Sequence, residues 1–333
     1  MRTEGRAALV ILWISTGLHA ADTPTIHTIY KSTDQGRSWL RSDSGLLRDS
    51  RTNALTTFGK AVLAGTDSGI FVSQDSGQNW EAVPGTATKL GRVLCFASSA
   101  RTLFAGTQRS GVFASTDEGR TWKPVNEGLE DPNVRSLLSW QENLYAGTDT
   151  AGVFRSQDDG QTWTRFNQGI PPGAQVFAME AVGNSVFAGL YSKGLYRRDD
   201  RQQSWVKAGR VSPLVLATIG DTLVAGHNPG GILWSTDLGE TWSAGVAEGG
   251  RAPTKKAGLP ADAPVWSLAS NRRQVFAGAS DGTYYSGDSG RTWSRAEAGL
   301  PLVSPGVSFL VTDQFVLVAT IIQARDGKAN PAD

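Results

Sequence analysis

Short apolar runs alternate with polar turns along nearly the whole chain. Runs such as "RVLCFAS", "RSLLSW" and "VFAMEA" are each followed, a few residues later, by "LFAGT", "LYAGT" or "VFAGL". The runs are rich in Val, Leu, Phe and Tyr and are bounded by Gly, Asp, Asn or Pro, which is typical of strands joined by tight turns. No run is long and periodic enough to predict an amphipathic helix. We therefore expect an all-β protein.

A polar octet recurs between these runs. Its copies are "STDQGRSW", "SQDSGQNW", "STDEGRTW", "SQDDGQTW", "RDDRQQSW", "STDLGETW" and "SGDSGRTW". Their tryptophans are 41, 42, 41, 42, 37 and 51 residues apart. A period between about 20 and 50 residues indicates a solenoid, propeller or array. Four short strands per period predict the blade of a β-propeller.

The two ends of the repeat region predict how the ring closes. The first box is flanked by "TIHTIYKS" and "SWLRSD", which match the third and fourth strands of a blade. The last strands, "GVSFLVTDQFVLVAT", match the first and second strands and have no box after them. Together they would form one composite blade, and pairing them removes an open sheet edge. We predict a seven-bladed propeller of four-stranded antiparallel blades over residues 22–322, between a leader (1–21) and a polar tail (323–333).

The octet is explained by turn chemistry. The hydroxyl and the carboxylate can accept hydrogen bonds from backbone N–H groups of their own turn. The glycine permits positive φ, and the tryptophan can bury its ring against the neighbouring sheet. We expect a structural role for Asp34, Trp39, Asp75, Trp80, Asp117, Trp122, Asp158, Trp163, Asp200, Trp205, Asp237, Trp242, Asp288 and Trp293. Seven copies spread around a ring cannot converge on one substrate, and one carboxylate with one hydroxyl is too few ligands for calcium.

These octets resemble the Asp-box, or BNR, repeat (S/T-x-D-x-G-x-x-W) over residues 24 to about 320. Such repeats occur in sialidases, xyloglucan-cleaving glucanases, sortilin-type receptors and photosystem II stability/assembly factors. The regular spacing is most similar to the assembly factors and to exported bacterial BNR-repeat proteins. The resemblance implies that the boxes are structural turns away from any active site, and it says little about activity.

Enzymatic members of this family carry residues that this chain lacks. A sialidase implies an Arg-Ile-Pro segment near its start, and residues 21–60 contain none. Arginines are plentiful, but abundance does not define a sialidase triad. The xyloglucan-cleaving members place two propellers face to face, and this chain has room for one. His27 and His227 alone would remain after leader removal, so a multi-histidine metal site is not expected.

The N-terminus resembles a secretory signal. Arg2 and Arg6 precede the apolar run "AALVILWISTGL" and the small residues of "HAAD". This pattern predicts cleavage near residue 20 or 21 and export to the periplasm or the extracellular space. The alternative is an N-terminal anchor lying on the membrane surface. No other apolar stretch is long enough to span a bilayer.

The charge balance argues against a nucleic-acid partner, and the single cysteine has no partner for a disulfide within the chain. Cleavage at residue 20 would leave 30 basic and 30 acidic residues, so nothing indicates nucleic acid. Cys95, in an apolar run, is expected to be a buried thiol. We expect a monomer without metal or cofactor.

A ligand is expected on the face opposite the boxes, around the mouth of the central channel. Loops between second and third strands supply the candidates Asp67, Arg109, Asp149, Tyr191, Lys193, His227, Asn228 and Asp281. Blade starts add Arg48, Arg51, Arg92 and Arg135. The connection at 243–264, which carries Lys255 and Lys256, is either a flexible excursion or a partner-binding loop.

The sequence thus favours an exported, non-catalytic propeller that binds a protein or a polar polymer such as a glycan. An assembly or stability role for a membrane or envelope complex follows from the resemblance. The alternative is a glycoside hydrolase of the sialidase/BNR type acting at the channel mouth. A lectin with one sugar site per blade is less favoured, because the loops between second and third strands differ from blade to blade.

Overall fold

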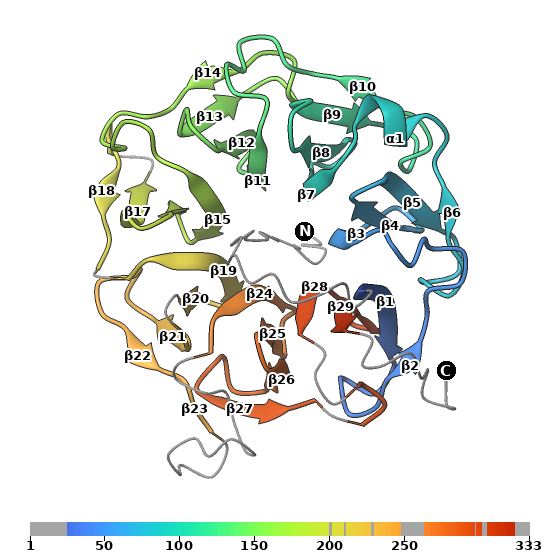
Figure 1. Cartoon of the computed structure of the whole chain (residues 1–333). Helices are drawn as coiled ribbons and strands as arrows, with labels where there is room; N and C mark the ends of the chain where they lie inside the picture. Colours follow the sequence, from blue (N-terminus) through green and yellow to red (C-terminus); the bar gives the residue numbers. More distant parts are fainter. Residues whose placement is uncertain are drawn as a thin grey trace.

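The computed structural model describes residues 25–199, 202–209, 211–227, 230–247, 263–296, 298–301 and 305–323. Seven sheets stand around a central axis and form a closed ring (Figure 1). The predicted leader, residues 248–262 of the long connection and the tail beyond residue 323 lie outside the described residues. One short helix, α1 (Thr86–Lys89), was not expected from the sequence.

Six blades are built from consecutive strands, with the first strand of each nearest the axis (Figure 1). Blade one contains β3 (Thr52–Phe58), β4 (Ala61–Thr66), β5 (Gly69–Ser73) and β6 (Glu81–Ala82). Blade two contains β7 (Val93–Ser98), β8 (Leu103–Thr107), β9 (Val112–Ser115) and β10 (Lys123–Pro124). Blade three contains β11 (Val134–Trp140), β12 (Asn143–Thr148), β13 (Val153–Ser156) and β14 (Thr164–Arg165).

The remaining complete blades follow the same order. Blade four contains β15 (Val176–Val182), β16 (Ser185–Leu190), β17 (Gly194–Asp199) and β18 (Val206–Lys207). Blade five contains β19 (Pro213–Ile219), β20 (Thr222–His227), β21 (Ile232–Ser235) and β22 (Ser243–Ala244). Blade six contains β24 (Val265–Ser270), β25 (Val275–Ala279), β26 (Gly282–Ser286) and β27 (Thr292–Arg295).

The seventh blade joins the two ends of the repeat region. Its sheet order is β2-β1-β29-β28, where β1 (Thr25–Ser32) and β2 (Leu40–Arg41) pair with β28 (Gly306–Val311) and β29 (Val316–Gln323). Strands β1 and β29 are antiparallel from Thr25↔Gln323 to Ser32↔Val316. The predicted seven-bladed ring, closed by a composite blade, is therefore confirmed. Strand β29 reaches residue 323, one residue beyond the predicted end of the propeller.

The hydrophobic core lies between the blades. One cluster joins Ile29 and Leu317 of the composite blade to Leu55 of blade one, all at most 1% exposed. Close approach is helped by a glycine in the second strand: a Cβ on Gly147 would lie 2.6 Å from Cγ1 of Val176 in the next blade. The recurrent "AG" of the second strands is thus a packing feature, because a side chain there would collide with the neighbouring inner strand.

Several blades are also tied to the preceding blade through the backbone N–H of their box tryptophan. The backbone N–H of Trp163 donates to the carbonyl of Glu127 at 2.8 Å, and its indole Nε1 donates to the carbonyl of Val125 at 2.8 Å. Both acceptors lie just after the fourth strand of the preceding blade. The same backbone bond recurs, for instance, from Trp80 to Ser44 and from Trp205 to Gln168.

The long connection contributes a strand beyond the predicted four. Strand β23 (Val246–Ala247) adds to the outer edge of blade six, parallel to β27. The N–H of Val246 donates to the carbonyl of Arg291 at 2.9 Å. The start of this connection therefore follows the inter-blade pattern of the other connections. Among the described residues no helix is long and apolar enough to cross a membrane.

Candidate functional site

The strand order gives the ring two different faces. Turns between first and second strands share one face with the box turns, here called the box face. The N–H of Lys60, in such a turn of blade one, lies 3.4 Å from Oε1 of Glu118 in the box of blade two. Loops between second and third strands share the other face with the blade connections, here called the connection face. The described candidates Asp67, Arg109, Asp149, Tyr191, Lys193, His227 and Asp281 lie on the connection face; Asn228 lies outside the described residues.

Every innermost strand is irregular near its connection-face end. The strand register shifts between Val134 and Ser136 in β11, and at the equivalent place in the other six inner strands. A β-bulge of this kind changes the direction of the side chain at the bulge. The residues at the shifts are Asn53, Leu94, Arg135, Phe177, Leu214, Trp266 and Val307. Sequence alone did not reveal this ring of bulges.

The bulge residues make the connection face asymmetric. Blades one and three place polar Asn53 and Arg135 at the shift. Blades four, five and six place Phe177, Leu214 and Trp266 there. The charged pairs described next all belong to blades one to three. The bulge position is therefore polar in blades one and three only, because blade two and the composite blade place Leu94 and Val307 there.

Asp67 joins blade one to blade two. Nε of Arg92 lies 2.8 Å from its Oδ1, and Nη2 of Arg92 donates to its Oδ2 at 3.1 Å. The amide of Asn53 donates to Oδ1 of Asp67 at 2.8 Å and to the carbonyl of Val93 at 3.1 Å. Asp67 and Arg92, both predicted for the ligand face, thus form an ion pair across the boundary between blades one and two.

Asp149 has the same kind of partner in blade three. Arg135 donates from Nε to Oδ1 at 2.7 Å and from Nη2 to Oδ2 at 3.1 Å. Gln175, at the start of blade four, donates to Oδ1 at 3.2 Å. Paired, two-point contacts of this type fix geometry as well as charge. The guanidinium of Arg135 also lies 4.7 Å from the ring of Phe177.

A buried acid that the sequence analysis missed organises the loop between these units. Asp131 is 4% exposed and accepts hydrogen bonds from the N–H of Asn133 at 2.9 Å and from the N–H and hydroxyl of Thr150, each at 2.7 Å. Burial would raise the pKa of Asp131, but these hydrogen bonds outweigh it and lower the pKa. The turn signal "DPN" was the available hint in the sequence.

The fourth-blade candidates have local partners. Nζ of Lys193 donates to the carbonyl of Pro172 at 2.8 Å. The ring of Tyr191 lies 5.2 Å from that of Phe177. These contacts hold the loop against the blade connection.

The other candidates differ in exposure and in their hydrogen-bond partners. Arg109 is exposed, and its backbone N–H donates to the carbonyl of Pro132 at 3.2 Å. Asp281 accepts a hydrogen bond from the hydroxyl of Tyr284 at 2.8 Å. Burial lowers the pKa of His227. These residues lie on different blades and do not form one cluster.

His27, which the sequence analysis did not assign to the ligand face, lies at this face beside Arg51. The backbone N–H of His27 donates to the carbonyl of Arg48 at 3.0 Å, so β1 contacts the connection that leads into blade one. Burial first, and then the charge of Arg51, lower the pKa of His27. Burial also lowers the pKa of Arg51.

On the opposite face, six boxes share one pattern of hydrogen bonds. In the third box, the Ser115 hydroxyl donates to Oδ1 of Asp117 at 2.8 Å and accepts from the N–H of Gly119 at 3.0 Å. Asp117 also accepts from the N–H of Thr121 at 2.9 Å and from its hydroxyl at 2.6 Å. The seventh-position side chain is therefore part of the turn, a contact that the sequence motif does not specify.

The fifth box compensates for its lost serine. The N–H of Gln202 donates to Oδ1 of Asp199 at 2.9 Å, so the second-position carboxylate accepts the bond that serine accepts elsewhere. The guanidinium of Arg198, in the serine position, lies 3.7 Å from the ring of Phe166. Trp205 is still buried, at 3% exposed. Asp200 lies outside the described residues.

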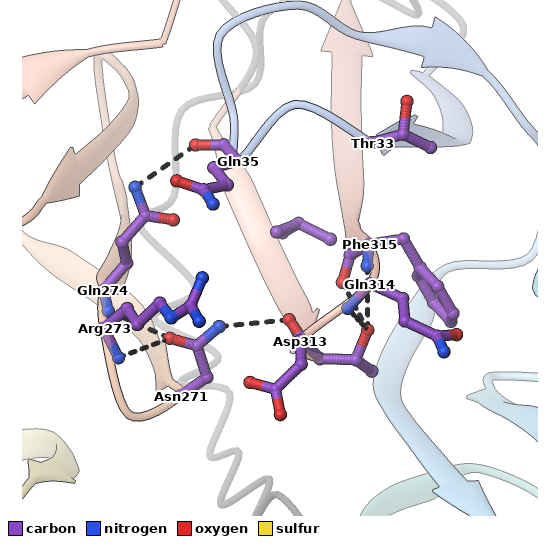
Figure 2. Close-up of a pocket in the computed structure, with 10 residues that line it drawn as sticks. Thr33, Gln35, Asn271, Arg273, Gln274, Asp313, Gln314 and Phe315 are labelled. Carbon is purple, nitrogen blue, oxygen red and sulfur yellow. Dashed lines mark hydrogen bonds between the residues drawn. The ribbon is translucent and has the colours of Figure 1, made fainter.

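A polar pocket lies on the box face, away from the predicted ligand face (Figure 2). It is lined by the box turn at Thr33 and Gln35 and by the first turns of blade six and the composite blade, including Arg273 and Asp313. The amide of Asn271 donates to the carbonyl of Thr312 at 3.0 Å, joining two of these turns (Figure 2).

The described acids do not assemble a metal centre. No group of three or more His, Cys, Asp or Glu side chains that could hold a metal ion occurs within the part of the chain that the structure describes. Glu180 is a buried acid, 3% exposed in the innermost strand β15, and its Oε1 accepts from the N–H of Ala181 at 2.9 Å. Cys95 is buried, and burial raises the pKa of its thiol.

Fold and faces together define a single seven-bladed β-propeller whose connection face carries hydrogen-bonded ion pairs in blades one to three. Residues 86–301, more than half of the chain, match the family described as the DUF6242 beta propeller domain. The chain therefore belongs to this family. No curated protein matches it.

Solved structures show the same fold at low sequence identity. YCF48 bound to a D1 peptide is 14% identical, with a TM-score of 0.61, and the match covers 90% of this chain and 97% of that chain. The extracellular domain of a one-component system from B. thetaiotaomicron is 12% identical, with a TM-score of 0.64, covering 86% and 40% of the two chains. The GH74 xyloglucanase from Xanthomonas campestris is 17% identical, with a TM-score of 0.55, covering 76% and 45%.

Proposed function

We propose that this chain is an exported, non-catalytic binding propeller whose connection face holds a segment of a protein partner. The observation that carries the proposal is the state of the acids at the channel mouth. Asp67 and Asp149 are each bound by an arginine, Arg92 or Arg135, at two points. Fixed pairs of this kind present a pre-organised polar surface, which lowers the entropic cost of binding.

The comparisons support binding and export. A YCF48 structure of similar fold is described as bound to a peptide, and another structure of similar fold is described as an extracellular domain. An assembly or stability role for an envelope complex fits a rigid ring that docks a polypeptide. The Asp-box nature of the seven octets belongs to the same proposal, as does the structural role of their Asp and Trp residues.

Hydrolysis is less well supported. A glycoside hydrolase needs two carboxylates about 5–9.5 Å apart, one of them free to transfer a proton. On the connection face, Asp67 and Asp149 are held in ion pairs, and Asp131 is held by several hydrogen-bond donors. A GH74 enzyme has a similar fold, but that similarity does not transfer a reaction.

The test compares charge reversals on the two faces. The exposed pair Arg48 and Arg109 lies on the connection face, and the exposed pair Arg37 and Arg120 lies in box turns. We expect R48E/R109E to weaken capture of a partner from an envelope extract at least tenfold, measured by quantitative mass spectrometry, while R37E/R120E captures it like wild type. Equal loss with both variants would contradict a connection-face site. Release of sugar from xyloglucan or a sialoside by the wild type would support the hydrolase instead.

A further inference from the structure

Unpartnered buried polar atoms gather where the composite blade meets blade one. Among the described residues, Nδ1 of His27, Oγ of Ser50 and Nε of Arg51 are buried without a hydrogen-bond partner. Ser50 and Arg51 are the last residues of the connection before β3, and the N–H of His27 is bonded to that connection at Arg48. Buried polar groups are rarely left unsatisfied, so three at one seam require an explanation.

Strand register places the imidazole in this seam. Side chains at every second position of a strand share a face. His27 therefore lies on the same side of β1 as Ile29, and it is paired across the sheet with Ile321. Ile29 and Ile321 belong to the cluster that packs against Leu55 of blade one. The ring of His27 consequently faces blade one, where Arg51 immediately precedes the inner strand β3.

The guanidinium of Arg51 has no ion pair among the described residues. Its charge disfavours the imidazolium of His27, and the charge of Arg92 in turn disfavours the charged form of Arg51. Asp67 is the acid that attracts Arg51, but its oxygens are already bonded to Arg92 and Asn53. Asp49, the other acid that acts on His27, is an exposed residue of the connection.

We propose that this seam is a binding site for one carboxylate. Nε of Arg51, Nδ1 of His27 and the Ser50 hydroxyl are all able to donate hydrogen bonds to its oxygens. A monoanion matches the single charge of Arg51, which has no ion pair among the described residues, whereas phosphate would carry more negative charge than that. His27 and Arg51 are half-buried, so the seam lies close to the surface, and the carboxylate would displace the contacts that now bury the three donor atoms. The idea that the site contacts an acidic group of a protein partner rests on the proposed function. The ability of the site to bind a carboxylate does not.

Bound carboxylate has a definite effect on His27. The free site holds the pKa of His27 below its ordinary value, because burial and Arg51 disfavour the imidazolium. A carboxylate reverses the local charge, favours the imidazolium and raises the pKa. The charged groups that act on the ring are Arg51, Asp67 and Asp49.

The experiment titrates the histidines of the full chain by NMR, with His27→Gln used to assign the His27 imidazole signal. Sodium acetate, compared with sodium chloride at equal ionic strength, should raise the pKa of His27 saturably, by about one unit. Arg51→Gln should abolish the saturable rise, and Arg109→Gln, an exposed arginine elsewhere on the same face, should not. Acetate should also raise the Tm of wild type but not of Arg51→Gln.

Three outcomes would overturn the carboxylate site. They are an equal rise with chloride, a saturable rise that persists in Arg51→Gln, and saturation by inorganic phosphate without saturation by acetate. None of these depends on partner capture. A connection-face charge reversal can therefore abolish capture while acetate leaves His27 unchanged, and the two proposals can fail separately.

Discussion

At the scale of single residues, each of the six boxes that keep the serine is a turn held by its own side chains. The carboxylate accepts several donors, and the hydroxyl both donates and accepts, so few polar groups of the turn depend on water. In the sixth box, the Thr241 hydroxyl first, then its N–H and the Ser235 hydroxyl, hold the pKa of Asp237 at about 2. In the first box, the Ser38 hydroxyl has the leading role in holding the pKa of Asp34 at about 2.

We expect these carboxyls to make the stability of the fold sensitive to acid in a defined pH window. Their folded pKa lies below the ordinary value of 3.8. Their contribution to stability is therefore complete above about pH 4 and is lost as pH falls toward about 2. We expect the free energy of unfolding in urea to fall across that window in wild type. The double variant D34N/D237N should be less stable at pH 6 and should show a shallower acid decline.

Asp159→Asn is the matched control, because it removes an exposed carboxylate from a variable box position. An acid decline as steep in D34N/D237N as in the control would show that the box carboxyls do not govern acid stability.

At the scale of elements, the blades are joined by a recurrent glycine that the octet does not include. In the connections "SDSGLL", "NEGLE", "NQGIP" and "EAGLP" a glycine with positive φ lies against the carbonyl of a box tryptophan in the neighbouring blade. At Gly169 the φ is 92°, and a Cβ would lie 2.2 Å from the carbonyl oxygen of Trp205. This glycine allows the connection to reach the next box, so it is as structural as the box itself.

Two glycines of one connection provide a test. Gly169→Ala should lower the free energy of unfolding by more than about 2 kcal/mol, because it combines an unfavourable φ with a backbone collision. Gly173→Ala has a φ of 62° but nothing within 4 Å of its Cβ, so it should lose only the conformational part, about 1–2 kcal/mol. Urea unfolding measures both. Equal losses would mean that the contact with Trp205 is not required.

The number of blades was predictable because the octet recurs once per blade. The structural role of its hydroxyl, carboxylate and glycine stays a prediction, argued from chemistry that acts within eight residues. The lone half-blades at the two ends predicted closure because strands must be paired. The bulge at Arg135 was not predictable, since it depends on register with β12 rather than on residue type. The pairing of Arg92 with Asp67 was missed because it joins two blades across 25 residues.

At the scale of the whole molecule, closure of the ring depends on the composite blade, which is built from the two ends of the repeat region and packs against blade one. Leu317 is fully buried in β29, and a Cβ on Gly77 of blade one would lie 2.7 Å from its Cδ1. The core on this side of the composite blade therefore joins both ends of the repeat region to blade one.

Leu317→Ala should cost about 2–5 kcal/mol, as a buried large-to-small change. The loss should appear as a shift of one cooperative urea transition, because every blade contacts two others. Leu40→Ala, at a side chain 78% exposed on the outer edge of the same blade, is the control and should change stability little. A separate early transition in L317A would indicate that the composite blade opens alone.

Thr25 and Gln323 are neighbours in the composite blade. The same ring could therefore be encoded with the chain starting at a different blade. A short linker between these neighbouring positions, with new termini cut at the exposed Gly173, would give a circular permutant built from seven uninterrupted blades. Such a permutant would move the two chain ends to the opposite part of the ring and make the composite blade covalently continuous from β29 to β1.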